Sequence, residues 1–341
     1  MNDITEVILN WYDEHKRSLP WRDDVSPYRS LISEVMLQQT RVETVKPYFQ
    51  RFMESFPTVE TLANASQDQV LAHWSGLGYY SRARNLHHAA KQIVEMGSFP
   101  NTILELRKLK GVGEYIAGAI GSIAFGLDVA SVDGNHHRVL SRIFCSKGGR
   151  KDMWVLAESL LPEGRSGDFN QALMDIGSGI CVAKIARCDR CPISSYCQAL
   201  QKGEVSLYPV KKKKKVVPVE EYICLRNIEN GEILLGLRSS KGLYGGMMEP
   251  PMFLVSDYSS DKAYSVLEEK LGISMTNKSI IGKVEHVLTH KKMVVHILET
   301  QFNGSPMQAH YQNLETKKIS ECSEVGISSL AKKIIKFQGD K

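Results

Sequence analysis

Long apolar segments are absent from this 341-residue sequence, and their absence argues against a membrane-spanning helix. The chain begins with MNDITEVILNWYDEHKR, which mixes both charge signs and lacks the apolar stretch of a signal peptide. A strong net charge is also absent, because the formal value is +5, so a polyanionic partner needs a local concentration of positive charge. From these features we expect a cytoplasmic protein without a membrane partner, and we expect a monomer.

Cysteine is scarce, and the count of seven is odd, which argues against a disulfide framework and favours a metal site in a chain without an export signal. Four of the cysteines fall in one short segment with the spacing C-x6-C-x2-C-x5-C, and they are Cys181, Cys188, Cys191 and Cys197. Structural zinc normally takes paired C-x2-C knuckles, and this segment has one such pair, so the uneven spacing favours a [4Fe-4S] cluster. Zinc and four unrelated buried cysteines are the alternatives.

Strand-like alternation is hard to find over roughly the first 200 residues, where apolar residues follow helical spacing. We therefore interpret residues 1–201 as an all-α domain. Residues 202–218 contain two prolines and five consecutive lysines, which predicts a basic linker with little capacity to pack. Beyond the linker, EYICLRNI (221–228) and EILLGLR (232–238) flank an Asn230-Gly231 turn and predict a hairpin. KVEHVL (283–288) and MVVHILETQF (293–302) predict a second strand pair, and helices are predicted over 263–271 and 328–337. Residues 219–341 are therefore predicted to form a smaller α/β domain.

Two glycines lie two positions apart in the segment LKGVGEYIAGAI, between two expected helices. Such glycines allow a tight turn with accessible backbone N–H groups, and the helix that follows points its positive end at the same place. Because this arrangement suits a phosphate group, the candidate phosphate contacts are Lys110, Gly111, Val112 and Gly113. A G-x-G turn also occurs as a plain packing joint between helices. The basic residues that could add phosphate contacts are Arg82, Arg84, Arg138, Arg142 and the lysines at 211–215.

Seven motifs, in order along the chain, are similar to those of one protein family. They are LPWR (19–22), SEVMLQQT (33–40), GLGYYSRARNL (76–86), LKGVGEYIAGAI (109–120), VDGN (132–135), FNQALMDIG (169–177) and the four-cysteine segment (181–197). On these motifs the chain resembles the adenine DNA glycosylase (MutY) family of the helix-hairpin-helix superfamily. The resemblance implies a multidomain protein: an all-α helix-hairpin-helix glycosylase domain with a four-cysteine iron-sulfur loop, and a smaller, Nudix-like α/β domain.

The resemblance also implies an enzyme of base-excision repair that acts on double-stranded DNA. Its target would be adenine opposite 8-oxoguanine and, less well, adenine opposite guanine. Since the glycosidic bond is inaccessible inside a duplex, the adenine would be flipped out of the helix. The alternatives are another helix-hairpin-helix mismatch glycosylase or a bifunctional one, and an iron-sulfur protein that binds DNA without catalysis.

Release of adenine needs a proton on the leaving base and stabilisation of a cationic sugar, and two carboxylates in different surroundings can divide that work. Glu34 lies in an apolar stretch that would raise its pKa, and the resemblance implies that it is the acid at adenine N7. The resemblance also implies that Asp133, before a predicted helix, stays ionised toward the sugar, with Asn135 in support. The plainer alternatives are an exposed helix acid at Glu34 and an N-cap at Asp133 or Asn135.

In related bifunctional glycosylases, a lysine just after the G-x-G turn forms a Schiff base with the sugar. This chain has Tyr115 at that position. We therefore expect hydrolysis of the N-glycosidic bond without strand cleavage. We also expect Tyr115 to pack beside the catalytic acid.

The resemblance implies five substrate contacts in the helical domain, which are Arg22, Gln39, Thr40, Tyr79 and Gln171. Gln39 and Tyr79 would wedge into the duplex at the damaged pair, whereas Arg22 and Gln171 would contact the flipped adenine. Four histidines come in adjacent pairs that cannot face one ligand from a helix. We expect surface positions for all four, which are His87, His88, His136 and His137.

In the second domain, the resemblance implies recognition of 8-oxoguanine. The candidate contacts are Thr289, whose hydroxyl could bond N7 of the lesion, and His290. The segment SVLEEKLGI keeps one of the three acids of a Nudix box, Glu269, so metal-dependent pyrophosphate cleavage is not expected.

Overall fold

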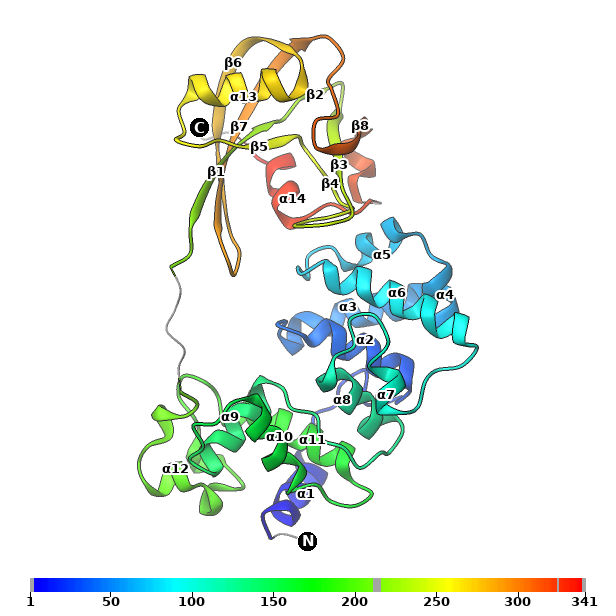
Figure 1. Ribbon diagram of the computed structural model, residues 1–341, viewed down its shortest axis with the longest axis vertical. Coiled ribbons are helices and arrows are strands. Elements are labelled where there is room, and N and C mark those ends of the chain that lie inside the picture. Colours follow the sequence, from blue (N-terminus) through cyan, green and yellow to red (C-terminus); the bar gives the residue numbers. More distant parts are fainter. Residues whose placement is uncertain (1–2, 211–215, 324, 339–341) are drawn as a thin grey trace. The chain divides into compact units, whose positions relative to one another are not determined.

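The computed structural model describes residues 3–210, 216–323 and 325–338, so the lysine run predicted as a phosphate contact lies outside the described residues. The chain forms two compact units (Figure 1). The first unit takes the chain up to Asn64 and resumes at Asn85. The second unit takes Ala65–Arg84 together with Lys214–Lys341. This division differs from the predicted domains, because one segment of the expected helical domain belongs to the second unit.

The first unit is built from helices in its described part, as the sequence predicted. Its helices are α1 (Asp3–His15), α2 (Pro27–Leu37), α3 (Val42–Ser55), α4 (Val59–Asn64), most of α6 (Ser81–Met96), α7 (Ile103–Leu106), α8 (Glu114–Ala124), α9 (Gly134–Ile143), α10 (Arg150–Glu158), α11 (Ser166–Asp175) and α12 (Gln198–Gln201). A π-helical turn, Ile176–Ile180, follows α11, and 3₁₀ turns occur at Cys188–Arg190, Ser194–Tyr196 and Val205–Leu207. Across the described ranges, no helix is long and apolar enough to cross a membrane.

Capping side chains explain where the site helices begin. The hydroxyl of Ser26 accepts from the backbone N–H of Arg29 at 3.2 Å, and Pro27 occupies the first turn of α2, where an N–H group has no helical partner. Asp133 caps α9 in the same way. Both caps fix the helix start, and therefore the direction in which the next side chains point.

A buried apolar core joins α1, α9, α10 and α11 in the first unit. Its fully buried members include Ile8, Leu140, Met153 and Phe169, and each such side chain contributes about 1.5–3 kcal/mol by its burial. On α8, a Cβ at Gly118 would lie 2.2 Å from the carbonyl oxygen of Ala130. The glycine thus permits the close approach of the loop that leads to α9.

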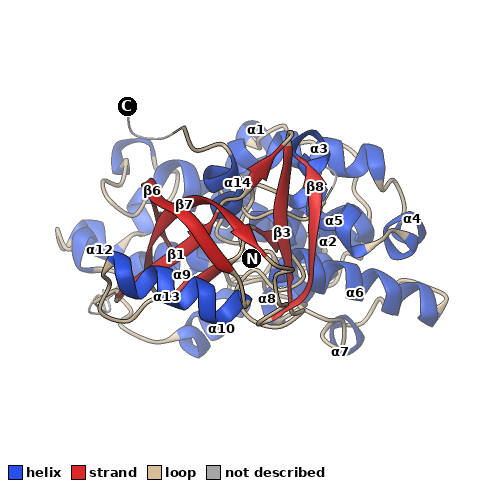
Figure 2. Ribbon diagram, turned by 90° about the horizontal axis from the view of Figure 1, so that it is seen from above, coloured by secondary structure: helices blue, strands red, loops and turns tan. Residues whose placement is uncertain are grey.

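The second unit contains α5 (Gln67–Trp74) and two four-stranded sheets, whose strands are red in Figure 2. The first sheet has the order β5-β1-β7-β6, and in the second β3 pairs with β2, β4 and β8. The strands are β1 (Val219–Leu225), β2 (Ile228–Glu229), β3 (Glu232–Arg238), β4 (Met248–Glu249), β5 (Met252–Leu254), β6 (Ser274–Val287), β7 (Lys292–Asn303) and β8 (Tyr311–Lys318). The helices are α13 (Ser260–Leu271) and α14 (Ser329–Ile335), with a 3₁₀ turn at Ile319–Ser323. An α/β domain is confirmed.

Most predicted local pairings in the second unit are confirmed. Asn230 and Gly231 have φ angles of 51° and 79°, and their turn joins β2 to β3. β6 pairs with β7, and the two predicted helices are α13 and α14. β1 instead pairs parallel with β7 and antiparallel with β5. Alternation reveals that β1 is a strand, but it does not reveal such distant partners.

Long-range contacts explain why Ala65–Arg84 belongs to the second unit. The hydroxyl of Ser75 donates to the carbonyl of Ile327 at 2.9 Å, 252 positions away. The rings of Tyr80 and Tyr244 meet edge to face with centroids 6.2 Å apart. Periodicity within a short segment carries no information about partners at this separation.

Candidate active site

Glu34 lies near the end of α2 with a relative exposure of 4%. The Oη hydroxyl of Tyr115, from the first turn of α8, donates to Oε2 of Glu34 at 2.5 Å. Burial raises the pKa of Glu34 to about 7; the Tyr115 hydrogen bond opposes this rise, and the charge of Asp133 adds to it. Glu34 can therefore hold a proton near neutral pH, and the alternative of an exposed helix acid is wrong.

Asp133 is held by four hydrogen bonds at the start of α9. Its Oδ1 accepts from the backbone N–H groups of Asn135 and His136, both at 2.8 Å, and lies 2.8 Å from Nδ1 of His136. Its Oδ2 accepts from Nδ2 of Asn135 at 2.8 Å. Burial acts to raise the pKa of Asp133, but the bonds from His136 and Asn135 outweigh it and hold that pKa below its usual value. Asp133 is the N-cap of α9, and the capping bonds themselves favour the ionised carboxylate.

The two carboxyl groups are electrostatically coupled, although they differ in ionisation. Burial is the main cause of the raised pKa of both Glu34 and Tyr115, and the charge of Asp133 raises each of them further. The ionisation of each of the three groups therefore depends on the others. The site therefore offers a buried acid that keeps its proton beside an anion. Acid-catalysed cleavage of a glycosidic bond requires this division of labour.

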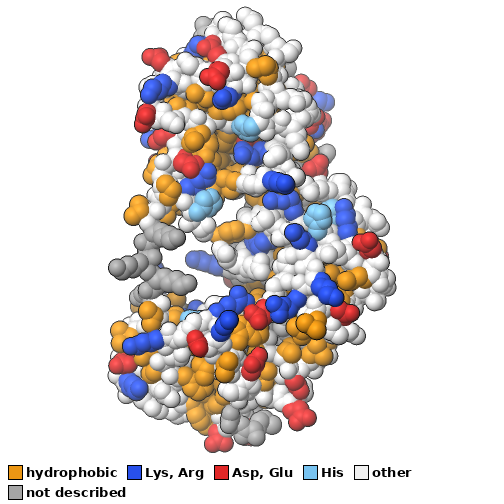
Figure 3. All heavy atoms as spheres, viewed as in Figure 1, with side chains coloured by type: hydrophobic (Ala, Val, Ile, Leu, Met, Phe, Trp, Pro, Cys, Tyr) orange, Lys and Arg blue, Asp and Glu red, His pale blue; other side chains and the backbone are white. Residues whose placement is uncertain are grey.

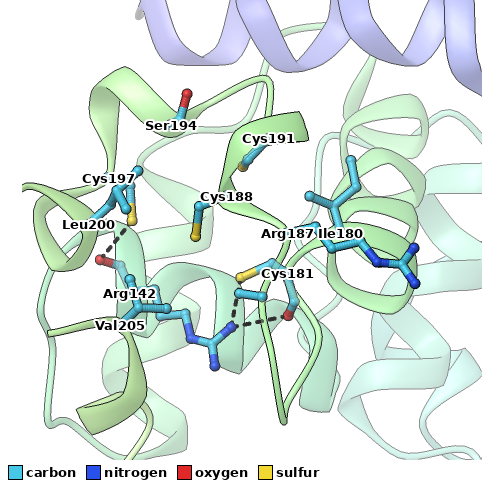
Figure 4. A pocket seen from close by; sticks show the side chains of 11 residues that line it. Arg142, Ile180, Cys181, Arg187, Cys188, Cys191, Ser194, Cys197, Leu200 and Val205 are labelled. Carbon is cyan, nitrogen blue, oxygen red and sulfur yellow. Dashed lines mark hydrogen bonds between the residues drawn. The ribbon is translucent and has the colours of Figure 1, made fainter. Parts of the chain in front are cut away.

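The four predicted cysteine ligands surround one cavity. Figure 4 shows the side chains of Cys181, Cys188, Cys191 and Cys197 around a common space, which Arg142 and Leu200 also line. Nη1 of Arg142 donates to Sγ of Cys181 at 3.1 Å, which places a positive charge beside a sulfur. Four sulfur donors around one cavity have the chemistry of an iron-sulfur site. Among the described residues, no three His, Cys, Asp or Glu side chains are grouped tightly enough to hold a single metal ion.

Comparison with known proteins shows the family of this chain. Residues 32–162 match the family described as HhH-GPD superfamily base excision DNA repair protein. The adenine DNA glycosylase of Buchnera aphidicola subsp. Baizongia pistaciae (strain Bp) is 36% identical over 85% of this chain and 84% of its own. This chain belongs to the adenine DNA glycosylase family. The Rattus norvegicus member is 32% identical over 98% of this chain and 79% of its own.

Other family members and solved structures extend this comparison. The Arabidopsis thaliana adenine DNA glycosylase is 32% identical over 97% of this chain, which spans 63% of the length of that relative. A thermostable thymine-DNA glycosylase structure is 30% identical, with a TM-score of 0.54, and covers 58% of this chain and 95% of its own. The structure of a non-covalent endonuclease III-DNA complex, at 22% identity and a TM-score of 0.52, shares the fold alone. The family resemblance is confirmed, and the chain is a member of a family of DNA glycosylases.

Arg22, predicted to contact adenine, forms a two-pronged ion pair with Asp175 at the end of α11. Its Nη1 and Nη2 donate to Oδ2 and Oδ1 at 2.8 and 3.0 Å, and Nε of Arg17 donates to the same carboxylate at 2.9 Å. Gln171 lies one turn before Asp175, half-buried on the same face of α11. Adenine contacts by Arg22 and Gln171 stay predictions. Asp175 is the partner of Arg22 that sequence reasoning missed, although an acid in the apolar end of this helix was a usable signal.

The hairpin between α7 and α8 makes the predicted tight turn. Gly111 has a φ of 82°, and a Cβ there would lie 2.7 Å from Cβ of Asn85. Gly113 caps α8, the side chain of Val112 is buried and that of Lys110 is exposed. Val112 could therefore meet a phosphate only through its backbone. Phosphate binding at the turn stays a prediction.

Further exposed cations lie near this hairpin. The guanidinium of Arg150, at the start of α10, lies 3.8 Å from the carboxylate of Glu114, at the start of α8. The space-filling view in Figure 3 shows Lys and Arg side chains gathered along the helical part of the chain. Positive charge concentrated in this way is what a polyanionic partner requires.

The arginines that were predicted as additional phosphate contacts donate hydrogen bonds to groups of the protein itself. They are Arg82, Arg84, Arg138 and Arg142. Nη2 of Arg138 donates to Oδ1 of Asn135 at 2.7 Å, and its Nε donates to the carbonyl of Cys181 at 2.7 Å. Charge alone cannot tell an arginine that faces solvent from one that ties two loops together. Here, Arg138 connects the start of α9 to the cysteine loop.

Gln39 and Tyr79 have φ angles of 57° and 49°, a left-handed backbone that residues other than glycine seldom adopt. Both side chains are exposed, with Tyr79 at 42%. The hydroxyl of Thr40 donates to the carbonyl of Gln38 at 3.4 Å. Backbone strain is often retained at functional positions. The predicted wedge by Gln39 and Tyr79, and a substrate contact by Thr40, nevertheless stay predictions.

Two of the four histidines expected at the surface are buried. His87 and His136 have relative exposures of 4% and 0%. Adjacent residues on a helix point about 100° apart, so one member of each pair faces inward. His136 is a neighbour of the candidate site that sequence reasoning missed, because its Nδ1 lies 2.8 Å from Oδ1 of Asp133. An Asp at a helix start followed by a His three positions later was the available signal.

Proposed function

We propose that this DNA glycosylase removes adenine paired with 8-oxoguanine, and less well adenine paired with guanine, by hydrolysis of the N-glycosidic bond. The observation that carries the proposal is a buried Glu34 that keeps its proton near neutral pH, coupled to an ionised Asp133. Membership of the adenine DNA glycosylase family supports adenine as the base. The adenine is flipped out of the duplex before reaction, because its glycosidic bond is otherwise inaccessible.

Glu34 is the general acid in this mechanism. Since Tyr115 donates to Oε2, the proton of neutral Glu34 sits on Oε1, and Oε1 delivers it to N7 of adenine. The protonated base then leaves with the electron pair of the C1′–N9 bond. Glu34 is now an anion, and the hydrogen bond from Tyr115 stabilises it in that form.

Asp133 stabilises the cationic sugar that remains when the base departs. Its charge lies in a largely buried site, where electrostatic interactions are stronger than in water. Asn135 holds Oδ2 of this carboxylate in place. Water then attacks C1′ and loses a proton to the Glu34 carboxylate, which restores the acid and leaves an abasic site with the strand intact.

The experiment that tests this function uses duplexes with A opposite 8-oxoguanine, A opposite guanine and T opposite guanine. Each duplex is incubated with enzyme, treated with alkali to break abasic sites, and analysed for strand cleavage. We expect cleavage of the two adenine duplexes and an intact third duplex. Cleavage of the T duplex alone would make thymine the substrate base, which is the alternative raised by the thymine-DNA glycosylase structure.

Borohydride treatment of the enzyme with its substrate duplex is expected to yield no covalent enzyme–DNA adduct. A Schiff base needs an amine at the sugar, and the residue that contacts Glu34 is a phenol, Tyr115. The measurement is gel analysis of enzyme and labelled duplex after reduction, with a bifunctional glycosylase as positive control. High-yield trapping of the wild-type protein would overturn the monofunctional mechanism.

Purified protein is expected to contain about four iron and four sulfide per chain, the content of a [4Fe-4S] cluster. Cys181, Cys188, Cys191 and Cys197 would hold the cluster, which supplies a cross-link within their loop when bound. Cys191→Ser should lower the iron content, whereas Cys322→Ser, a buried cysteine outside the loop, should not. Stoichiometric zinc in place of iron would overturn this assignment.

The preference for 8-oxoguanine is the ratio of the excision rate for A opposite 8-oxoguanine to the rate for A opposite guanine. We expect Thr289→Val to lower this ratio about fivefold, because the loss of one neutral hydrogen bond has an effect of this size. Thr289 and His290 are exposed in the turn between β6 and β7. A point variant is the sharper test, because deletion of residues 219–341 would strip contacts from Ala65–Arg84. Thr276→Val, an exposed control in β6, should leave the ratio unchanged. An unchanged ratio in Thr289→Val would remove the hydroxyl from lesion recognition.

A further inference from the structure

His136 contacts the catalytic carboxylate in two ways. Its side chain is fully buried, and Nδ1 lies 2.8 Å from Oδ1 of Asp133. Its backbone N–H donates to the same oxygen at 2.8 Å. An ionised carboxylate can only accept hydrogen bonds, so Nδ1 must carry the proton in this contact.

The second ring nitrogen indicates which form of the imidazole fits the site. Nε2 of His136 is buried and has no hydrogen-bond partner in the described structure. A neutral ring with its proton on Nδ1 leaves only a lone pair at Nε2. A cationic ring would leave a charged N–H group buried without an acceptor, which costs considerably more. The geometry therefore suits a neutral donor, which leaves the negative charge of Asp133 intact.

The two carboxylate oxygens of Asp133 accept different numbers of hydrogen bonds. Oδ1 receives three contacts, from two backbone N–H groups and from Nδ1 of His136. Oδ2 receives one, from Nδ2 of Asn135. A carboxylate has about four lone-pair sites in total, so the spare accepting capacity lies on Oδ2.

We propose that His136 is a positioning residue, which holds Oδ1 of Asp133 as a neutral donor so that the less occupied Oδ2 faces the cationic sugar. This inference rests on the proposed function. It assigns His136 no proton transfer and no contact with DNA. The neighbouring His137 differs, because its Nδ1 lies 3.5 Å from the hydroxyl of Ser141 within α9 and does not reach the carboxylate.

The test compares substitutions that keep or lose the donor. Asparagine at 136 places an amide N–H near the position of Nδ1, whereas glutamine places its amide farther from the backbone and leucine has no donor. We expect His136→Leu and His136→Gln to lower the single-turnover rate of adenine release about ten- to hundredfold, the effect of one hydrogen bond to a charged group. His136→Asn should recover most of the rate, and His137→Leu should match the wild type.

A second measurement separates positioning from a general loss of structure. Each variant is titrated with duplexes that carry a cationic pyrrolidine or an uncharged tetrahydrofuran in place of the deoxyribose. Wild type and His136→Asn should prefer the cationic duplex, and this preference should shrink in His136→Leu and His136→Gln. Equal rates and equal preferences for His136→Asn and His136→Gln would overturn the inference, even if His136→Leu fails to fold. Absence of adenine release by the wild type would instead overturn the proposed function, and this inference with it.

Discussion

Replacement of Glu34 by glutamine is expected to leave binding of the mispaired duplex intact and to slow adenine release by about 10²- to 10⁴-fold, the range for general acid catalysis. Glutamine has the shape of glutamate, and its carbonyl can still accept from Tyr115, but it has no proton to give to N7. The measurements are the single-turnover rate on A opposite 8-oxoguanine and the dissociation constant for the same duplex. Glu43→Gln, an exposed acid in α3, is the matched control. A Glu34→Gln rate within tenfold of the wild type would remove Glu34 from this role.

The pH dependence of the wild-type excision rate is a second test of Glu34 as the general acid. Because burial raises the pKa of Glu34 to about 7, its proton is lost as pH rises through that value, and excision should decline there. The pKa of Asp133 is held below its usual value, so its charge persists on the acid side of neutrality. The decline above pH 7 should disappear in Glu34→Gln, since no titrating acid is left at that position.

The same substitution should also raise stability at and above neutral pH. The folded-state pKa of Glu34 exceeds the ordinary value of 4.5, so the folded protein loses stability as pH rises from about 4.5 to about 7. A shift of this size corresponds to about 3 kcal/mol, which glutamine would recover above pH 7. Thermal unfolding of both proteins at pH 5 and pH 8 therefore shows whether the inactive variant is folded. A buried acid such as Glu34 lowers the stability of the fold, and such a loss is expected where the burial is needed for activity.

The sequence was most informative where function depends on residues close together in the chain. Asp133 and Asn135 lie in one turn, and the four cysteines lie in one loop, so their grouping could be predicted from spacing. The apolar neighbours of Glu34 predicted its burial correctly. Local patterns also predicted the β2–β3 turn and the β6–β7 pair.

Contacts between distant parts of the chain could not be predicted in this way. Arg22 pairs with Asp175, 153 positions away, and Ser75 bonds to Ile327, 252 positions away. Periodicity describes which face of a helix is apolar, but it does not identify the partner of that face. The burial of His136 was missed because adjacent histidines were treated as a pair, although a helix turns them to different faces.

Asp133→Asn is expected to slow adenine release by about 10²- to 10³-fold, the loss seen when one electrostatic contact to the transition state is removed. Asparagine caps helices about as well as aspartate, so α9 should keep its start. The side chain would, however, carry no charge to oppose the sugar cation. Asp128→Asn is the control, since Asp128 accepts from the backbone N–H of Gly164 and the hydroxyl of Ser166 in a structural role.

The pH profile of Asp133→Asn distinguishes lost charge from lost structure. The charge of Asp133 contributes to the raised pKa of Glu34, so removing that charge should lower this pKa and move the alkaline decline of the residual activity to lower pH. A merely disordered site would lose rate without such a directed shift. If the decline stays at the wild-type pH while the rate falls, the charge of Asp133 does not raise the pKa of Glu34, and the coupling of the two carboxyl groups is contradicted.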